Sequence, residues 1–214
     1  MANVRVHSFA VSLDGYAAGP DQSLANPLGI GGERLHEWTV ETLAWRQSHG
    51  LDGGEANVDS DFIARGEVGI GATLMGRNMF GPIRGEWPDE SWRGWWGDEP
   101  PYHHPVVVLT HHARSPLEME GGTTFHFVTD GVEAGLQQAI DLADGQDVRV
   151  GGGTSTIQQL LRARLIDELH LAVVPTLLGA GERLFDGLGD LAGYECTELV
   201  GSPRAAHVRL ARTT

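Results

Sequence analysis

The segment that most constrains this chain is a strand-to-helix turn that contains three consecutive glycines. A short run rich in valine at residues 148–150 leads directly into Gly151–Gly153. Three hydroxyl residues follow at 154–156, and an apolar pattern with helical spacing continues to Leu161. Such a turn exposes backbone N–H groups at the positive end of a helix dipole, which favours a bound phosphate. The alternative interpretation is a tight connection that binds nothing.

Length and charge limit the kind of protein that this can be. The chain has 214 residues, which predicts a single domain over residues 1–214, because one hydrophobic core can serve up to roughly 250 residues. Its net charge is -14, with only 15 basic residues. Proteins that track nucleic-acid phosphates need clustered Lys and Arg, so we expect no nucleic-acid partner. An anionic ligand has to be held locally, by helix ends and a few arginines.

Cysteine content and hydropathy bear on the compartment. Cys196 is the single cysteine, so an internal disulfide is excluded and a reducing environment is the simplest expectation. No apolar run approaches the ~20 residues that a membrane-spanning helix needs. The first residues lack the basic-then-apolar layout of a secretory signal. We therefore expect a cytoplasmic protein with no membrane partner.

Strand and helix patterns alternate along the chain, which is typical of an α/β fold. The expected strands have β-branched or continuous apolar composition, and the expected helices have apolar residues on one stripe. The apolar run 105–110 is typical of a strand buried on both faces, and the last two strands suggest an antiparallel hairpin. Strands are expected at 4–11, 69–75, 105–110, 123–128, 148–150, 167–174, 194–200 and 206–211, and helices at 33–48, 58–65, 131–143 and 154–164, with a short one after Gly76.

A tryptophan-rich segment interrupts this alternation. Residues 84–105 hold four of the six tryptophans, together with Pro88, Pro100 and Pro101. Long aromatic segments of this kind serve as lids, substrate walls or subunit contacts. A surface loop that is held down by its own tryptophans is an equally good interpretation.

Three strand exits carry residues suited to a phosphorylated ligand. These are Gly76–Arg77, Thr110–His111 and Gly151–Thr156. In an open parallel sheet, ligands bind outside the carboxyl ends of the strands. The first strand is not followed by G-x-G-x-x-G, so the standard dinucleotide fingerprint is missing. The pairs His103–His104 and His111–His112 lack metal-ligand spacing, and we expect no metal.

The set of motifs resembles the dihydrofolate reductase-like superfamily, and most closely the reductase half of the deaminase–reductase of riboflavin biosynthesis. The matching segments span most of the chain in the family's order. They are Ser12–Gly15, Leu74–Phe80, Val108–Thr110, Gly151–Thr154 and Val174–Gly181. The resemblance implies a three-layer α/β fold with a central, mainly parallel sheet of about eight strands and an antiparallel C-terminal edge. The zinc-binding deaminase half has no counterpart in this sequence.

The resemblance also implies an NADPH site and a homodimer. By position, Gly76, Arg77 and Asn78 would face the adenosine 2′-phosphate and pyrophosphate, and Thr110 and His111 would lie near the adenosine half. Ala10 and Val11 would border the nicotinamide. The remaining cofactor-binding residues, which would hold the pyrophosphate, are Gly151, Gly152, Gly153, Thr154, Ser155 and Thr156.

The implied reaction is that of 5-amino-6-(5-phosphoribosylamino)uracil reductase, in which hydride passes to a small heterocyclic or carbonyl substrate. Hydride transfer needs a positioned ring, exclusion of water and often a proton donor. Asp59 and Asp14 are the candidate catalytic residues, with helix capping and turn formation as their alternative roles. The tryptophan-rich insertion leaves the substrate open. A flavin- or deazaflavin-using reductase and a non-catalytic dinucleotide-binding protein remain alternatives.

Overall fold

The computed structural model describes residues 2–189 and 193–213 and divides into two compact units. Unit 1 consists of residues 1–5 and 69–165, and unit 2 of residues 6–68 and 166–214. Each unit is assembled from segments that are far apart in the sequence. The expectation of one domain over the whole chain stays a prediction.

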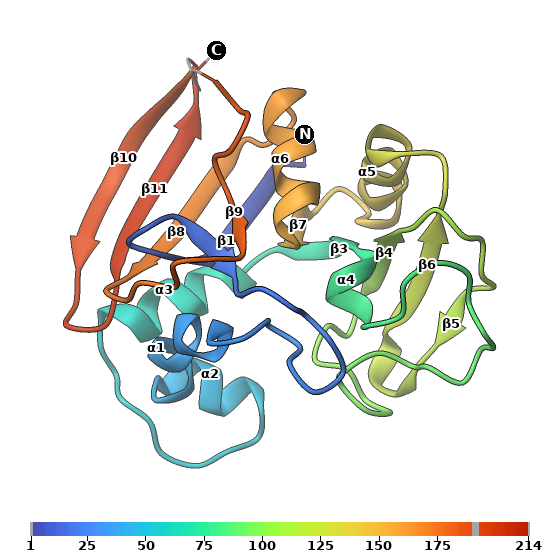
Figure 1. The fold of residues 1–214 in the computed structure, drawn as a ribbon, viewed down its shortest axis with the longest axis horizontal. Helices are drawn as coiled ribbons and strands as arrows, with labels where there is room; N and C mark the ends of the chain where they lie inside the picture. The colour runs from blue at the N-terminus through green and yellow to red at the C-terminus, as the bar shows by residue number, and fades with distance from the viewer. Residues whose placement is uncertain (1, 190–192, 214) are drawn as a thin grey trace. The chain divides into compact units, whose positions relative to one another are not determined.

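Unit 1 is built on a mainly parallel run of strands (Figure 1). The pairings of β3 with β7 and β4, and of β4 with β6, are parallel, whereas β5 joins β6 antiparallel. The strand order is β7-β3-β4-β6-β5. The bounds are Ile70–Gly76 for β3, Pro105–Leu109 for β4, Leu117–Glu118 for β5, Thr124–Val128 for β6 and Asp147–Gly152 for β7.

Helices cover this sheet because its strands are apolar on both faces. Val106, Val107 and Val108 of β4 are all 0% exposed, as the continuous apolar run predicted. Helix α5 (Val132–Leu142) packs on β4 and β3, and α6 (Thr154–Arg162) packs on β7 and β3. The short elements are α4 (Arg77–Phe80), which follows β3 directly, and the 3₁₀ turn η2 (Glu120–Gly122).

The tryptophan-rich segment 84–104 contains no helix or strand, and its aromatic rings hold it against unit 1. Trp87, Trp92 and Trp96 pack on the cluster that includes Phe80 and Phe125. The Trp92 indole donates to Phe80 O over 3.0 Å, and the Trp87 indole donates to His112 O over 2.9 Å. The segment is therefore a surface loop pinned by its own tryptophans, as one of the two sequence interpretations proposed.

Unit 2 carries the antiparallel part of the fold. Its strand order is β10-β11-β8-β1, and both β10–β11 and β11–β8 are antiparallel. The first two residues of β1 belong to unit 1. A separate pair, β2 and β9, is also antiparallel. The bounds are Val4–Ser12 for β1, Tyr16–Ala18 for β2, Glu168–Val174 for β8, Glu182–Arg183 for β9, Tyr194–Gly201 for β10 and Ala206–Arg212 for β11.

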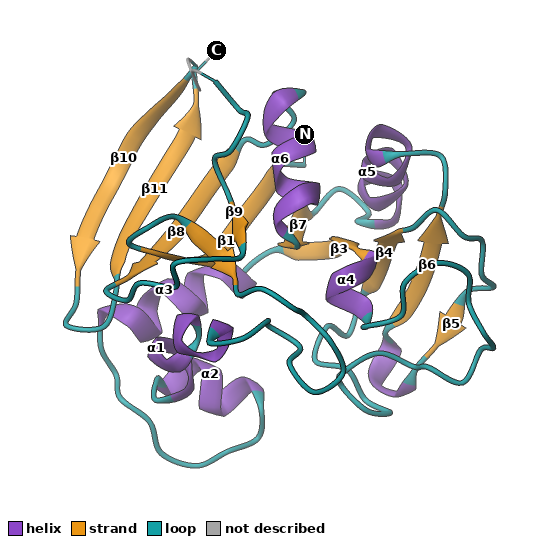
Figure 2. Ribbon diagram, viewed as in Figure 1, coloured by secondary structure: helices purple, strands orange, loops and turns teal. Residues whose placement is uncertain are grey.

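The helices of unit 2 correct one prediction. In place of a continuous helix over residues 33–48, the chain forms three short helices that cluster with a fourth (Figure 2). Buried Thr42 ends one helix by donating to Thr39 O and caps the next by accepting from Trp45 N. The bounds are Gly32–Leu35 for the 3₁₀ helix η1, Glu37–Val40 for α1, Leu43–Ser48 for α2 and Val58–Glu67 for α3.

The fold class agrees with the sequence analysis. Nine strands form a mixed, mostly parallel sheet with antiparallel strands at the C-terminal end, against about eight expected. The short strands β2, β5 and β9 were not predicted, because two or three residues give no periodic pattern. Over residues 2–189 and 193–213, the structure has no helix with the length and apolar character needed to cross a membrane.

Candidate functional site

The three predicted strand exits lie at one edge of the unit 1 sheet. Strand β3 is the central neighbour of β7 and β4, and all three run parallel. Met75 pairs with Gly152, and Gly76 pairs with Leu109, the residue before Thr110. Parallel strands end at the same edge, so the residues that follow β3, β4 and β7 meet there. The structure therefore brings Gly76–Arg77, Thr110–His111 and Gly151–Thr156 together, and their role in binding a cofactor stays a prediction.

Two of the glycines at this edge are required by the backbone. A Cβ built on Gly76 would lie 2.6 Å from Thr156 Oγ1, so only glycine lets β3 approach the start of α6 this closely. Gly152 has φ 119°, a conformation that L side chains rarely adopt. The Gly152–Gly153 peptide is cis. The turn places the N-terminus of α6 beside the end of β3.

The start of α6 has the geometry of an anion site. The first helical hydrogen bonds are donated to Gly153 O by Thr156 N over 3.0 Å and Ile157 N over 3.2 Å. The N–H groups of Thr154 and Ser155 precede these bonds and belong to the unpaired first turn. A Cβ built on Gly153 would have no described heavy atom within 4 Å beyond its chain neighbours, so the turn itself is open on that side. Thr154 and Thr156 are buried, whereas Ser155 is exposed.

The turn that follows β4 is closed by a hydrogen bond to the Thr110 hydroxyl. Thr110 N continues the sheet pattern by donating to Val128 O over 3.0 Å. Its Oγ1 accepts from His112 N over 3.2 Å, so this hydroxyl first serves the turn. His111 is exposed beside it, and Asn78 is exposed on α4. Both side chains are free to reach a ligand at this edge.

Arg77 forms the positively charged part of the site. Its guanidinium carbon lies 3.6 Å from the centre of the Trp87 ring, and its Nη1 donates to Gly85 O. Its Nε and Nη2 are buried and have no hydrogen-bond partner among the described residues. Burial lowers the pKa of Arg77, and the nearby charges of Arg84 and Arg114 lower it further. Two oriented donors in a repulsive cationic environment are suited to a phosphate.

Arg114 completes an arginine cluster, which we define as Arg77, Arg84 and Arg114. The Arg114 guanidinium carbon lies 4.9 Å from the Trp87 ring centre, and its Nη2 donates to Glu90 O and Trp92 O. Its Nη1 is also buried without a partner in the described part of the chain. The sequence analysis missed Arg84, Arg114 and the stacking on Trp87. The position of Arg114 shortly after the Thr110–His111 exit was the available signal.

Asp59, a candidate catalytic residue, lies inside unit 2. It is 1% exposed, and its Oδ1 is 2.7 Å from Nε2 of His207, which is 0% exposed. Its Oδ2 accepts a hydrogen bond from Ser202 Oγ over 3.0 Å. Asn57, not Asp59, caps α3 by accepting from Ser60 N. The Asp59 carboxylate is therefore engaged on both oxygens, and its catalytic role stays a prediction.

A histidine chain extends from this pair, and the sequence analysis did not foresee it. His207 Nδ1 lies 3.1 Å from His170 Nε2, and His170 Nδ1 accepts from Ser8 N over 3.0 Å. Phe62 stacks on both imidazoles, at 4.6 Å from His170 and 4.1 Å from His207. Burial, with the nearby charges of His7 and His207, lowers the pKa of His170 to about 2. Because of this low pKa, His170 is neutral in the folded protein at neutral pH.

Asp14, the second candidate, ties a turn to a loop. Its carboxylate accepts from Ser12 Oγ over 2.6 Å, Leu178 N over 3.1 Å and Gly179 N over 2.7 Å. The Ser12 bond and these backbone bonds lower its pKa to about 2. Asp14 is therefore ionised at neutral pH and holds no proton to donate. This arrangement agrees with the turn-forming alternative, and the catalytic role stays a prediction.

Ala10 and Val11 lie on β1 in unit 2. Each is 3% exposed, because β1 is a buried strand. Their contact with a nicotinamide ring stays a prediction.

The fold belongs to the dihydrofolate reductase-like class, and solved structures of other proteins share this fold. A riboflavin biosynthesis protein from Shewanella sp. PV-4 is 22% identical, covers 100% of both chains and has a TM-score of 0.60. A pyrimidine reductase-like protein from Corynebacterium diphtheriae is 13% identical over 100% of this chain and 92% of its own, with a TM-score of 0.54.

A bifunctional protein is also similar in fold. The diaminohydroxyphosphoribosylaminopyrimidine deaminase/5-amino-6-(5-phosphoribosylamino)uracil reductase from Thermotoga maritima is 15% identical, with a TM-score of 0.55. The match covers 99% of this chain and 56% of that one. No curated protein sequence matches the chain. The RibD C-terminal domain family matches residues 6–208, and the chain belongs to this family.

Proposed function

We propose that the protein is an NADPH-dependent reductase that delivers hydride to a small heterocyclic or carbonyl substrate. The observation that carries this proposal is Arg77, whose two buried donors lack a partner among the described residues, directly after the glycine that closes β3. An adenosine 2′-phosphate would satisfy these donors and offset the mutual repulsion of the arginine cluster. The first turn of α6 would hold the pyrophosphate.

The roles of the individual residues follow from this assignment. NADPH, when bound, supplies the hydride. Gly153 and the N–H groups of Thr154 and Ser155 orient the pyrophosphate, and His111 lies near the adenosine half. Arg77 selects for the 2′-phosphate, with Asn78 beside it. The protein contributes position and exclusion of water, which are the main requirements of hydride transfer.

The experiment is a comparison of NADPH and NADH binding by calorimetry, with Arg77→Gln as the test and Arg162→Gln as the control. Arg162 is an exposed arginine at the end of α6 and changes the net charge by the same amount. We expect Arg77→Gln to weaken NADPH binding by about tenfold or more, as one lost charge-assisted contact implies, and to leave NADH binding nearly unchanged. Arg162→Gln should alter neither.

Other outcomes assign a different function. Equal losses for NADPH and NADH would remove Arg77 from the 2′-phosphate role. A purified protein that is yellow, or that binds a flavin or deazaflavin and shows no thermal shift with NADPH, would replace NADPH by the flavin-type alternative.

A second candidate, a dinucleotide-binding protein without catalysis, is favoured by one observation. Asp14 is ionised, and both carboxylate oxygens of Asp59 are occupied by contacts with His207 and Ser202, so neither candidate is placed to act as a proton donor. Binding of NADPH without its oxidation by any member of a substrate panel would support this candidate. Substrate-dependent oxidation of NADPH would exclude it.

The substrate is proposed from the family. The Thermotoga relative is described as a 5-amino-6-(5-phosphoribosylamino)uracil reductase, which makes that compound the first substrate to test. The assay is the loss of NADPH absorbance with and without it. A homodimer is proposed as well, and sedimentation equilibrium would measure the mass of the protein in solution.

A further inference from the structure

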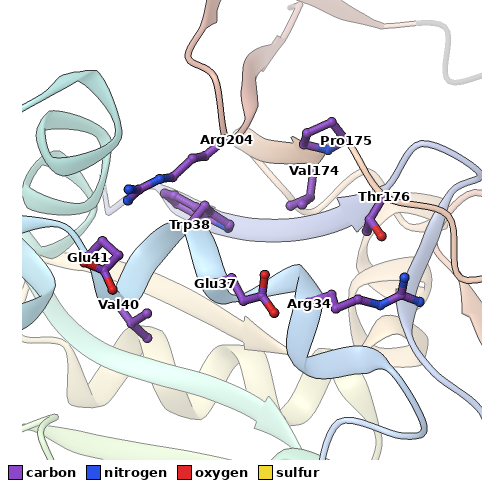
Figure 3. Close-up of a pocket in the computed structure, with 9 residues that line it drawn as sticks. All are labelled: Arg34, Glu37, Trp38, Val40, Glu41, Val174, Pro175, Thr176 and Arg204. Carbon is purple, nitrogen blue, oxygen red and sulfur yellow. The ribbon is translucent and has the colours of Figure 1, made fainter.

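Unit 2 contains a cavity of about 610 Å³ that no feature of the proposed cofactor site uses (Figure 3). Helix α1 and its flanking residues form one wall, and the end of β8 with Pro175 and Thr176 forms the other. Its size is within the range of small-molecule sites. The polar groups in its lining are Arg34, Glu37, Trp38, Glu41, Thr176 and Arg204.

Two buried hydrogen-bond donors of the lining residues have no partner among the residues that the structure describes. Trp38 is 1% exposed, and its Nε1 has no hydrogen-bond partner among the residues that the structure describes. Arg204 pairs through Nη2 with Glu55 Oε1 at 3.1 Å, which leaves its buried Nη1 without a partner in the same set of residues. Unsatisfied buried donors are costly and uncommon, so each calls for an acceptor. A carboxylate has two acceptor oxygens and is therefore a suitable acceptor for such donors.

Arg34 also lines the cavity, but it is exposed and partly engaged. Its Nη2 donates to Leu177 O over 3.2 Å, and its Nε lies 3.4 Å from Gly31 O. Arg204 is the arginine of the lining whose unpaired donor, among the described residues, is buried.

The rim of the cavity carries negative charge, opposite in sign to that of Arg204. Glu37 and Glu41 are both exposed and line the cavity from positions i and i+4 of α1 and its C-cap. Residues at this spacing lie on the same helix face, so the two carboxylates create a common negative edge. Val40, Val174 and Pro175 supply apolar surface to the lining. An apolar ligand body with a cationic end would fit this edge.

The buried aspartate–histidine network positions both donors. Ser202 Oγ donates to Asp59 and accepts from Arg204 N and Ala205 N, each over 3.0 Å, which fixes the turn that carries Arg204. The Trp38 ring meets the His207 ring edge-on, with the centroids 5.2 Å apart. Asp59 and His207 therefore act as positioning residues for the cavity.

We propose that this cavity is a binding site for a small zwitterion with an apolar body. Its carboxylate is held by Trp38 Nε1 and Arg204 Nη1, and its protonated amine faces Glu37 and Glu41. The inference goes beyond the proposed function, because the lining of the cavity includes none of the residues proposed to bind the cofactor, and those proposed to hold its phosphates lie in unit 1.

The test uses three matched probes with the full chain and no dinucleotide. 4-(Aminomethyl)benzoate carries both charged groups, benzoate lacks the amine and benzylamine lacks the carboxylate. We expect 4-(aminomethyl)benzoate to bind at least about tenfold tighter than either of the others by calorimetry, since each charged end adds a hydrogen-bonded contact. Equal binding of all three, or no binding of any at millimolar concentration, overturns the proposal.

Variants assign the two ends. Arg204→Gln and Trp38→Phe should each remove most of the advantage of 4-(aminomethyl)benzoate over benzylamine. The double variant Glu37→Gln/Glu41→Gln should remove its advantage over benzoate. Arg162→Gln and the double variant Glu118→Gln/Glu133→Gln, at exposed residues of unit 1, are the charge-matched controls for Arg204→Gln and for the glutamate pair, and they should change nothing. Unchanged binding in the cavity variants overturns the proposal, whereas a failure of NADPH binding does not affect it.

Discussion

The arginine cluster of unit 1 and the buried aspartate–histidine network of unit 2 both concentrate polar groups, but they differ in what the fold leaves unpaired. In the cluster, Arg77 and Arg114 retain buried donors without partners among the described residues. In unit 2, Asp59, His207 and His170 bond to one another and to neighbouring groups. Groups left over by the fold indicate a ligand, whereas a network that satisfies itself indicates a structural role. This contrast makes separate predictions for the two regions.

The largest effect is expected from Asp59→Ala. The substitution leaves His207 Nε2 and Ser202 Oγ without their partner in a dry interior, because Asp59 and His207 are almost fully buried. We expect the free energy of unfolding to fall by about 3 kcal/mol, as measured by urea denaturation. A loss below about 1 kcal/mol would show that the network is not the structural element that the comparison assumes.

The conservative variant Asp59→Asn separates structure from catalysis. It keeps the shape of the side chain and one acceptor oxygen. If Asp59 is a proton donor, substrate-dependent NADPH oxidation should fall far more than stability in this variant. If it is a positioning residue, the two should change together.

The next effect is a dependence of stability on pH that comes from His170. Its pKa in the folded protein is about 2, below the ordinary 6.5, because of burial and the nearby charges of His7 and His207. The unfolded chain therefore takes up a proton below pH 6.5 that the folded protein refuses. Stability is fully present above pH 6.5 and is lost as the pH falls towards 2, at about 1.4 kcal/mol per pH unit.

Urea denaturation between pH 7 and pH 5 measures this loss, which we expect to reach about 2 kcal/mol. His170→Gln keeps an acceptor for Ser8 N and removes the titrating group. Its stability should vary less over the same interval, while His36 and His126, whose pKa values are also lowered by burial, contribute equally to both proteins. Parallel curves for the two proteins would show that His170 is not held neutral.

The sequence was informative wherever local chemistry decides the structure. The glycines after β7 and β3 and the hydroxyl residue after β4 were found because turns and parallel strand ends leave local signals. The sequence analysis placed these segments at the ends of strands in a mainly parallel sheet, but it did not predict that β3 is the neighbour of both β4 and β7. The residues at the strand ends could therefore be predicted, whereas the order of the strands could not.

Contacts between distant residues could not be predicted in this way. Leu43 N donates to Glu55 O, and this bond to a distant loop helps to break the expected helix. Asp59 and His207 are 148 positions apart, and no periodic pattern connects a helix start to a strand near the C-terminus. The stacking of Arg77 on Trp87 depends on the path of a loop without regular structure. Tertiary packing decides all three.

Two glycines at the same edge sharpen the contrast between fold and ligand. Gly76→Ala would place a Cβ 2.6 Å from Thr156 Oγ1, so we expect a loss of about 1 to 2 kcal/mol in the free energy of unfolding from overpacking. Gly153→Ala meets no described atom within 4 Å, so stability should change little. If the pyrophosphate lies against this turn, as proposed, the added methyl group keeps it from approaching the backbone, and NADPH binding should weaken by about tenfold.

Thermal denaturation and calorimetry on the two variants measure these effects. The comparison fails if Gly153→Ala binds NADPH as the unmodified protein does, because this turn would then not be the pyrophosphate site. It also fails if both variants lose stability equally.

The smallest effect is expected at Asp14, which lies outside both regions of the comparison. Its side chain is half-buried, and bonds from Ser12 Oγ, Gly179 N and Leu178 N lower its pKa from 3.8 to about 2. The ionised group therefore stabilises the fold above pH 3.8, and this contribution is lost as the pH falls towards 2. Asp14→Asn should lower the Tm slightly at pH 5, and the difference from the unmodified protein should vanish near pH 2. A Tm difference that persists at pH 2 would mean that the turn depends on the shape of the side chain and not on its charge. A large loss of NADPH oxidation at neutral pH with an unchanged Tm would instead identify Asp14 as a catalytic residue.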